Sequence, residues 1–85
     1  MDESDAVSRA KLLYPQRRVV DASGEVWVEE GWAQVRNNLY AVGVRRFSIS
    51  QPDAPAFILR GFGKDWESAL KMATIQAQKT KEKKA

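Results

Sequence analysis

The chain has 85 residues, 44% of them hydrophobic, and carries a formal net charge of +3. It contains no cysteine and no histidine, which excludes disulfides, thiolate nucleophiles, imidazole bases and the usual zinc ligands. This length predicts one domain with a thin core, which a helix packed on a sheet, or dimerisation, would stabilise.

The start of the chain and its charge distribution indicate a compartment and a class of partner. Residues 1–5 are acidic and precede no apolar run, and no segment approaches the ~20 apolar residues that span a bilayer. We therefore expect a cytoplasmic protein without membrane contact. Residues 1–30 hold seven acidic and four basic side chains, whereas residues 31–85 hold four acidic and ten basic ones. The basic second part suggests an anionic partner such as nucleic acid, or a charge excess that keeps the protein in solution.

The first elements are short. Residues 4–14 are predicted to form a helix, with Ser4 as its N-cap and Pro15 marking its end. Residues 17–20 follow as a strand, and residues 21–24 as a turn in which Gly24 takes a positive φ.

Residues 25–49 are predicted to form a long β-hairpin. Two β-rich runs flank Asn37-Asn38, and asparagine tolerates the left-handed backbone of a two-residue hairpin turn. Such a turn requires the numbers of paired residues to sum to 75. This register sets Trp32 against Gly43. It also pairs Glu29 with Arg46 and Glu30 with Arg45, and each such pair stabilises a sheet by roughly 0.2–1 kcal/mol.

The apolar residues of the hairpin do not fit one flat face. In strict alternation, those near the turn and those beyond Gly31 lie on opposite faces. We expect a β-bulge or a sharp bend near Gly31 or Gly43 to reconcile them. Trp32 and Trp66 are predicted to be core residues. Trp27 alternates with its apolar neighbours, and if exposed it would mark a binding face for nucleic acid or protein.

The second part of the chain is predicted to add a strand and a helix to the hairpin. Residues 50–55 include two prolines and are predicted to form a loop, followed by a strand at residues 56–62. Asp65 is expected to cap a helix that runs to about residue 79. Its sheet-facing stripe comprises Trp66, Ala69, Leu70, Ala73 and Ala77, with Met72 and Ile75 beside it. The single domain then spans residues 1–80, and the basic residues 81–85 are predicted to be a disordered tail.

Basic side chains are the main candidates for a site. Arginine offers a planar fork of donors for phosphates. Arg45 and Arg46 are expected to be neutralised by the two glutamates across the hairpin. Phosphate contacts are therefore assigned to the remaining basic residues, with Trp27 stacking on a base: Arg17, Arg18, Arg36, Arg60 and Lys64.

No catalytic residue, metal site or cofactor is predicted. Glu29 and Glu30 are neighbours on a strand, so their side chains point to opposite faces and cannot act together at one centre. Without histidine or cysteine, no other constellation for acid–base or nucleophilic chemistry is evident.

Residues 61–73 run from a strand through two glycines into a capped helix that carries alanines. This junction, Gly-Phe-Gly-Lys-Asp-Trp-Glu-Ser-Ala-Leu-Lys-Met-Ala, resembles the second half of a double-stranded RNA-binding domain. It is also similar to the same junction in other β-β-β-α nucleic-acid-binding domains. The resemblance implies phosphate contacts at the start of the helix. The paired lysines of the family are replaced by Trp66 and Glu67 here, so only the nearby Lys64 carries over.

Taken together, these patterns predict an α+β fold with a short N-terminal helix, an antiparallel sheet of three or four strands and a C-terminal helix packed on one face. The leading functional hypothesis is a small non-enzymatic nucleic-acid-binding or regulatory module that contacts phosphates through sheet arginines. The alternative is a protein-interaction module, such as an inhibitor, an adaptor or a homodimer. That module would use an exposed sheet edge or an aromatic patch around Trp27 and Tyr40.

Overall fold

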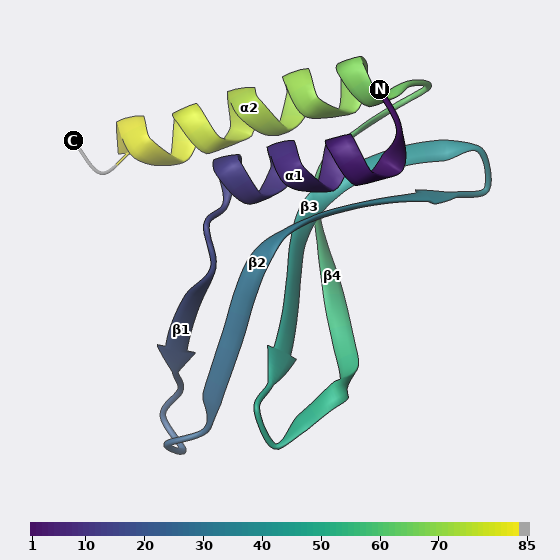
Figure 1. The fold of residues 1–85 in the computed structure, drawn as a ribbon. Helices are drawn as coiled ribbons and strands as arrows, with labels where there is room; N and C mark the ends of the chain where they lie inside the picture. Colours follow the sequence, from purple (N-terminus) through teal and green to yellow (C-terminus); the bar gives the residue numbers. More distant parts are fainter. Residues whose placement is uncertain (84–85) are drawn as a thin grey trace.

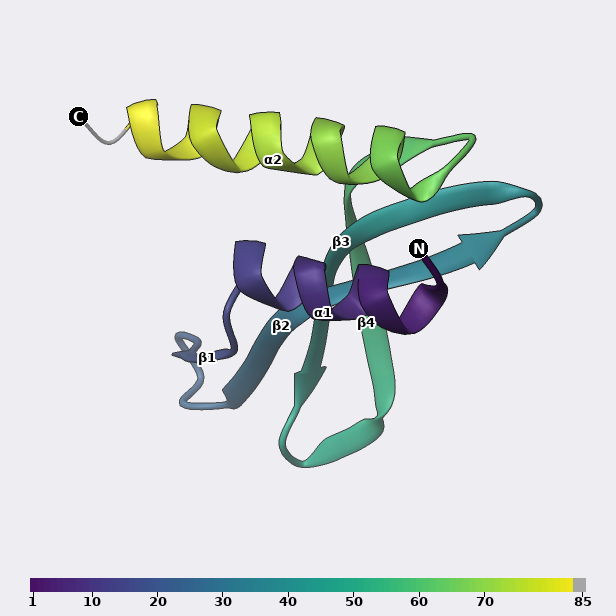
Figure 2. The ribbon, with the colours of Figure 1, turned by 45° about the horizontal axis from the view of Figure 1, so that its top comes forward.

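A computed structural model describes residues 1–83 of the chain, and the side chains of residues 1–79. In chain order the elements are α1 (Glu3–Leu13), β1 (Arg17–Val20), β2 (Val26–Arg36), β3 (Leu39–Ser48), β4 (Gln51–Gly63) and α2 (Trp66–Lys83). The strands form one antiparallel sheet in the order β1-β2-β3-β4, which confirms the predicted α+β fold (Figure 1). Both helices lie over one end of the sheet, and the strands extend beyond them (Figure 2).

Helix α1 begins slightly earlier than predicted. The N-cap is Asp2 rather than Ser4, and its carboxylate accepts a hydrogen bond of 2.8 Å from the backbone N–H of Asp5. A carboxylate at this position also interacts favourably with the positive end of the helix dipole. The helix ends at Leu13, with Tyr14 as its C-cap, just before Pro15.

The hairpin between β2 and β3 follows the predicted register throughout. Asn37 and Asn38 have φ values of 53° and 63°, as a two-residue turn of this kind requires. Pairing runs without interruption from Arg36 opposite Leu39 to Trp27 opposite Ser48. The preceding strand β1 and the positive φ of Gly24 are also confirmed.

The predicted irregularity near Gly43 is present, but it lies in a different pair of strands. The register between β3 and β4 shifts between Val42 and Gly43, which leaves Arg60 as the extra residue of β4. The β2–β3 pairing contains no such shift. The hairpin instead bends sharply where it passes beneath the helices (Figure 1), which agrees with the predicted bend. Its two apolar sets face opposite sides of the sheet, and no bulge brings them together.

Strand β4 is longer than predicted, and the expectation of a loop at residues 50–55 is wrong. The strand starts at Gln51 and includes both Pro52 and Pro55. It is an edge strand, so a proline there need not remove a ladder hydrogen bond. A second register shift, between Arg46 and Ser48 of β3, absorbs this proline segment.

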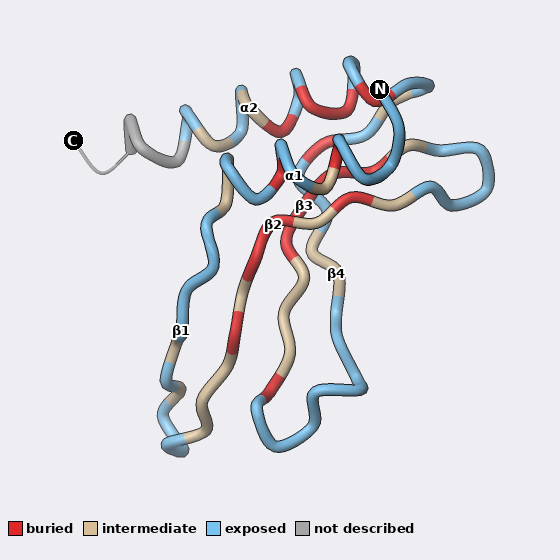
Figure 3. Tube along the Cα trace, in the orientation of Figure 1, coloured by how far each residue is buried: buried red, intermediate tan, exposed pale blue. Residues whose placement is uncertain are grey.

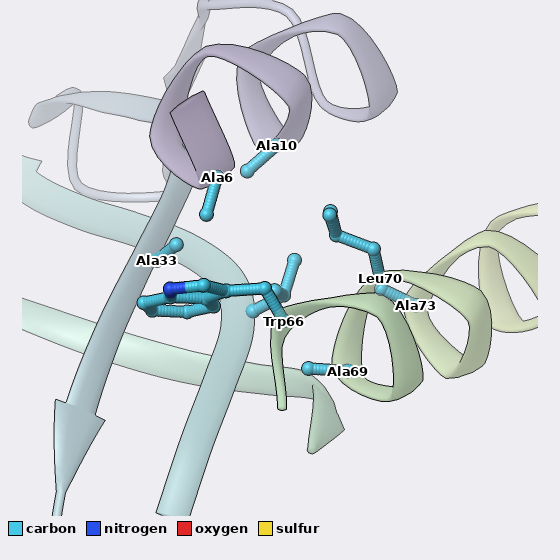
Figure 4. Packing of buried hydrophobic residues seen from close by; sticks show 8 residues of the cluster. Ala6, Ala10, Ala33, Trp66, Ala69, Leu70 and Ala73 are labelled. Carbon is cyan, nitrogen blue, oxygen red and sulfur yellow. The ribbon is translucent and has the colours of Figure 1, made fainter. Parts of the chain in front are cut away.

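The core lies between the helices and the sheet and is built largely from alanine. Its buried residues come from both helices and the two central strands: Ala6, Ala10, Ala33, Val42, Trp66, Ala69, Leu70 and Ala73 (Figure 4). The Tyr40 ring packs edge-on against the Trp66 indole, with centroids 4.7 Å apart. Trp66 is thus a core residue as predicted, whereas Trp32 is only half-buried and lies outside this cluster.

Glycines allow this close packing of helix on sheet. A Cβ atom on Gly31 would lie 2.0 Å from the carbonyl oxygen of Ala10 in α1. A Cβ atom on Gly61 would lie 2.3 Å from the carbonyl oxygen of Ala69 in α2. Both contacts are with helix backbone, which cannot rotate away as a side chain can. The helices therefore sit closer to these strands than any other residue would allow.

Helix α2 is capped as predicted but extends further. The backbone N–H of Ser68 donates a 2.7 Å hydrogen bond to the Asp65 carboxylate. The helix continues to Lys83, about one turn beyond the predicted end, so residues 81–83 are helical rather than part of a disordered tail. Met72 and Ile75 are exposed and do not widen the buried stripe. The expectation of disorder at residues 84–85 falls outside the described residues.

We predict that replacing Gly61 with alanine destabilises the fold by about 1–3 kcal/mol, the usual cost of overpacking. The added methyl group must push α2 away from β4, because the atoms that it meets are backbone. Chemical denaturation measures the free energy of unfolding. Gly24→Asn is the matched control, because open space surrounds Gly24 and asparagine tolerates its positive φ. A Gly61→Ala protein as stable as this control would contradict the packing described.

Candidate functional site

The sheet has two different faces, which the registers define. Gly31, Ala33, Val42 and Gly61 share the face that the helices cover. Side chains at the alternate positions of each strand lie on the opposite face, called here the outer face. Its apolar members are Val20, Val26, Val28, Trp32, Leu39, Phe47, Phe57, Leu59 and Phe62. Within residues 1–83 the backbones of both helices lie on the other face, and from α1 the Lys11 ammonium reaches the outer face, 5.9 Å from the Trp32 ring centroid.

The outer face carries most of the large apolar side chains that the strands expose. Exposure reaches 63% at Val20, 41% at Leu39, 48% at Leu59 and 45% at Phe62. Val35 is the one strand residue of this kind on the helix-covered face of the described chain. Most buried positions cluster where the strands pass beneath the helices, and further ones lie lower on β2 and β3 (Figure 3); two buried residues, Val28 and Ala41, belong to the outer face. Four large apolar side chains of the outer face are thus exposed to solvent.

A charge pair at the centre of the outer face neutralises itself. Glu30 and Arg45 face each other across β2 and β3 and form an ion pair, as predicted. The Arg45 guanidinium also lies over the Trp32 indole, 3.9 Å from the ring centroid. This stacked cation covers one face of the indole, so Trp32 is not free on that side.

The arginines predicted to contact phosphates do not share one surface. Arg17 lies on the helix-covered side and donates a 2.9 Å hydrogen bond to Glu29, a pairing that the sequence did not reveal. Arg18 and Arg36 lie on the outer face, on β1 and at the hairpin tip. Both are exposed, and neither forms an ion pair with another described residue. Only these two predicted arginines therefore belong to the outer face.

Lys64 lies in the short connection between β4 and α2, at an end of the molecule rich in acidic side chains. The first residue of the chain, Tyr40 and the start of α2 line one shallow pocket there, so the two helices begin side by side. Asp2 and Asp65 cap those helices, and Glu3, Asp5 and Glu67 follow in their first turns. Acidic groups so close oppose the approach of a phosphate to Lys64.

Trp27 is held in place by other side chains and is not an exposed stacking platform. Its indole N–H donates a 2.9 Å hydrogen bond to the Asp21 carboxylate. The Arg46 guanidinium lies 4.6 Å from its ring centroid, while Arg46 also pairs with Glu29 at 3.5 Å. The predicted patch around Trp27 and Tyr40 is not formed, because Tyr40 packs on the core at the other end of the sheet.

A pocket of about 330 Å³ opens on the helix-covered side, below the end of α1. Arg17 and Arg60 line it together with Glu29, Val44 and Ile58. Tyr14 also contributes, and its hydroxyl donates a 3.4 Å hydrogen bond to the carbonyl of Ala73. Burial raises the pKa of the Tyr14 phenol, and the charge of Arg60 opposes that rise. The mixture of acidic and basic groups gives this pocket no clear ligand preference.

The described residues contain neither a cluster of metal ligands nor a membrane-spanning helix. Within residues 1–83, no group of three or more acidic side chains is placed to hold a metal ion. No helix in the same part of the chain is long and apolar enough to cross a membrane. Glu29 and Glu30 lie on opposite faces and each pairs with arginine.

Comparisons with known proteins find no relative of this chain. No family model, no curated protein and no solved structure matches this chain.

We predict that the carboxylate of Asp21 has a pKa of about 2, which the Ser23 hydroxyl and the Trp27 indole lower from 3.8. Because folding lowers this pKa, the stabilisation by the carboxylate is complete above about pH 4 and is lost as the pH falls towards 2. Carboxyl chemical shifts in an NMR titration report the midpoint. Trp27→Phe removes one donor and should raise it, whereas Trp32→Phe, the control, should not. A midpoint near 3.8 in the parent protein would contradict this hydrogen-bond network.

Proposed function

We propose that the protein is a non-enzymatic protein-interaction module whose outer sheet face binds an apolar surface of a partner. One observation carries the proposal: aromatic and aliphatic side chains of all four strands gather on a sheet face that no described helix covers. Contiguous exposed apolar surface on a small soluble domain usually marks an interaction site. The self-neutralised pair of Glu30 and Arg45 at its centre suits an interface whose core excludes unpaired charge.

The sheet edges are less suited to binding than the face. Strand β1 is only four residues long and begins with two arginines. Strand β4 carries two prolines in its first part and the extra residue Arg60 further along. Short, charged, proline-containing and bulged strands are the usual means of preventing a sheet from pairing with another chain. The outer face is therefore better supported as a binding surface than the sheet edge that the sequence suggested.

A second candidate function is the binding of single-stranded nucleic acid by the same face. Arg18 and Arg36 are exposed there and could contact phosphates, while Phe57 and Phe62 could stack on bases. Aliphatic side chains such as Val20 and Leu59 offer little to a base, and Arg45 already covers the Trp32 ring. We rank this candidate second for that reason. It replaces the earlier set of contacts, since Arg17 and Trp27 are engaged elsewhere.

Site-specific photo-crosslinking tests the proposal in extract of the native host cell. A benzophenone side chain at Leu59 samples the outer face, and the same group at Ile75 samples the outward side of α2 as a control. These positions have similar exposure, 48% and 44%, so chance collisions should label them equally. We expect protease-sensitive adducts at Leu59 and none at Ile75. Equal labelling at both positions, or no protein adduct at Leu59, would contradict the proposal.

Retention of oligonucleotides tests the second candidate separately. Phosphate contacts strengthen at low salt, so a nucleic-acid-binding face should retain a single-stranded oligonucleotide at low salt and release it as salt rises. The double variant Arg18→Ala/Arg36→Ala should then lose retention, whereas Arg9→Ala, on the outward side of α1, should keep it. We expect no retention by the parent protein even at low salt. Retention that the double variant abolishes would favour nucleic acid over a protein partner.

A further inference from the structure

The distribution of apolar side chains indicates which partner covers the outer face. Five of the eight residues in the core cluster are alanines, and among the described residues Val42 is the one large side chain that is fully buried. A short chain with such small core residues removes little apolar surface from water. Larger side chains such as Leu59 and Phe62 remain exposed on the outer face. Folding of the single chain therefore leaves much apolar side-chain surface exposed to water.

A partner that completes the core must be present whenever the chain folds. A second copy of the same chain meets that condition, because it is made at the same time and place. Most homo-oligomers of soluble proteins are two-fold symmetric dimers, in which the same patch of each copy meets the other. Two sheets packed face to face, about 10 Å apart, are a common way of burying two such faces.

The size of the outer face suits a dimer interface. Three strands of ten or more residues and the short β1 give a footprint of roughly 15 Å by 33 Å, at about 4.8 Å between strands and 3.3 Å per residue. Laid flat, two such faces together measure on the order of 1,000 Å². The bend of the hairpin (Figure 1) sets how much of this area two copies bring together. Specific protein–protein interfaces bury at least about this much total surface area.

The charges on the outer face also permit two copies to meet. Glu30 and Arg45 neutralise each other at its centre. Arg18 lies on the short edge strand β1 and Arg36 at the hairpin tip, so both occupy the periphery. Two faces can then meet while these peripheral arginines stay in water, and the ion pair at the centre of each face brings no net charge into the interface.

We propose that a second copy of this chain occupies the outer face and forms a two-fold symmetric, sheet-to-sheet homodimer. This inference rests on the proposed function, whose binding face it uses. The alanine core explains why the chain needs a partner, and the outer face explains where that partner binds. Leu59 and Phe62, exposed in the single chain on strand β4, become apolar anchors of the dimer.

Analytical ultracentrifugation of the full chain tests the dimer. We expect twice the chain mass of 9.6 kDa at micromolar concentrations, and a melting temperature that rises with protein concentration. Leu59→Arg should weaken dimerisation by about 30-fold or more, as the loss of an apolar anchor does. Ile75→Arg on α2, at similar exposure, should leave it unchanged. The concentration dependence of the parent's melting temperature needs no variant and decides the question even if Leu59→Arg fails to fold.

The possible outcomes separate this inference from the proposed function. A parent protein that is monomeric at every concentration, with a melting temperature independent of concentration, overturns the homodimer. If Leu59 then crosslinks to a different protein in extract, the proposed function stands without the dimer. If Leu59 crosslinks to no protein, both fail. Retention of a single-stranded oligonucleotide by monomeric protein assigns the outer face to nucleic acid instead.

Discussion

The contact of helix backbone with glycine on one face of the sheet determines most of this structure. The backbone of α1 lies against Gly31 and the backbone of α2 lies against Gly61, so close that a Cβ atom on either glycine would not fit. Helices so close to the strands leave space only for small side chains around them, which explains the alanines on both helices and on β2. The same contact fixes which face of the sheet is covered. It therefore also fixes which face remains available.

The available face explains the proposed role better than any single residue does. A core rich in alanine leaves larger apolar side chains such as Leu59 and Phe62 exposed on the outer face, where contact with another surface would remove them from water. The acidic residues of the central strands are meanwhile engaged within the sheet: Glu29 pairs with Arg17 and Arg46, and Glu30 with Arg45. Little is left for chemistry at those carboxylates, and the arginines that they hold are not available to phosphates.

The sequence predicts most of the local structure correctly, but it does not predict which face of the sheet the helices cover. The Asn37-Asn38 turn determines the hairpin register, because a two-residue turn permits one pairing and the charge pairs agree with it. The role of β4 was missed because prolines are compatible with a strand only at an edge, and strand order is not visible in the chain. Trp32 is predicted to be a core residue because aromatic side chains of a small domain usually belong to its core, yet it lies on the face that the helices do not cover. Which face the helices cover depends on contacts with Gly31 and Gly61 that only the structure shows.

We infer that in solution the outer face is covered, whereas the outward side of α2 is open to solvent. NMR with a soluble paramagnetic cosolute measures this directly, since it attenuates the signals of methyl groups that solvent reaches. In the folded chain alone, the side chains of Leu59 and Ile75 are almost equally exposed. We predict strong attenuation of the Ile75 methyl signal and weak attenuation of the Leu59 methyl signals. The protection at Leu59 should decrease on dilution. Equal attenuation of both methyl signals at high protein concentration would contradict it.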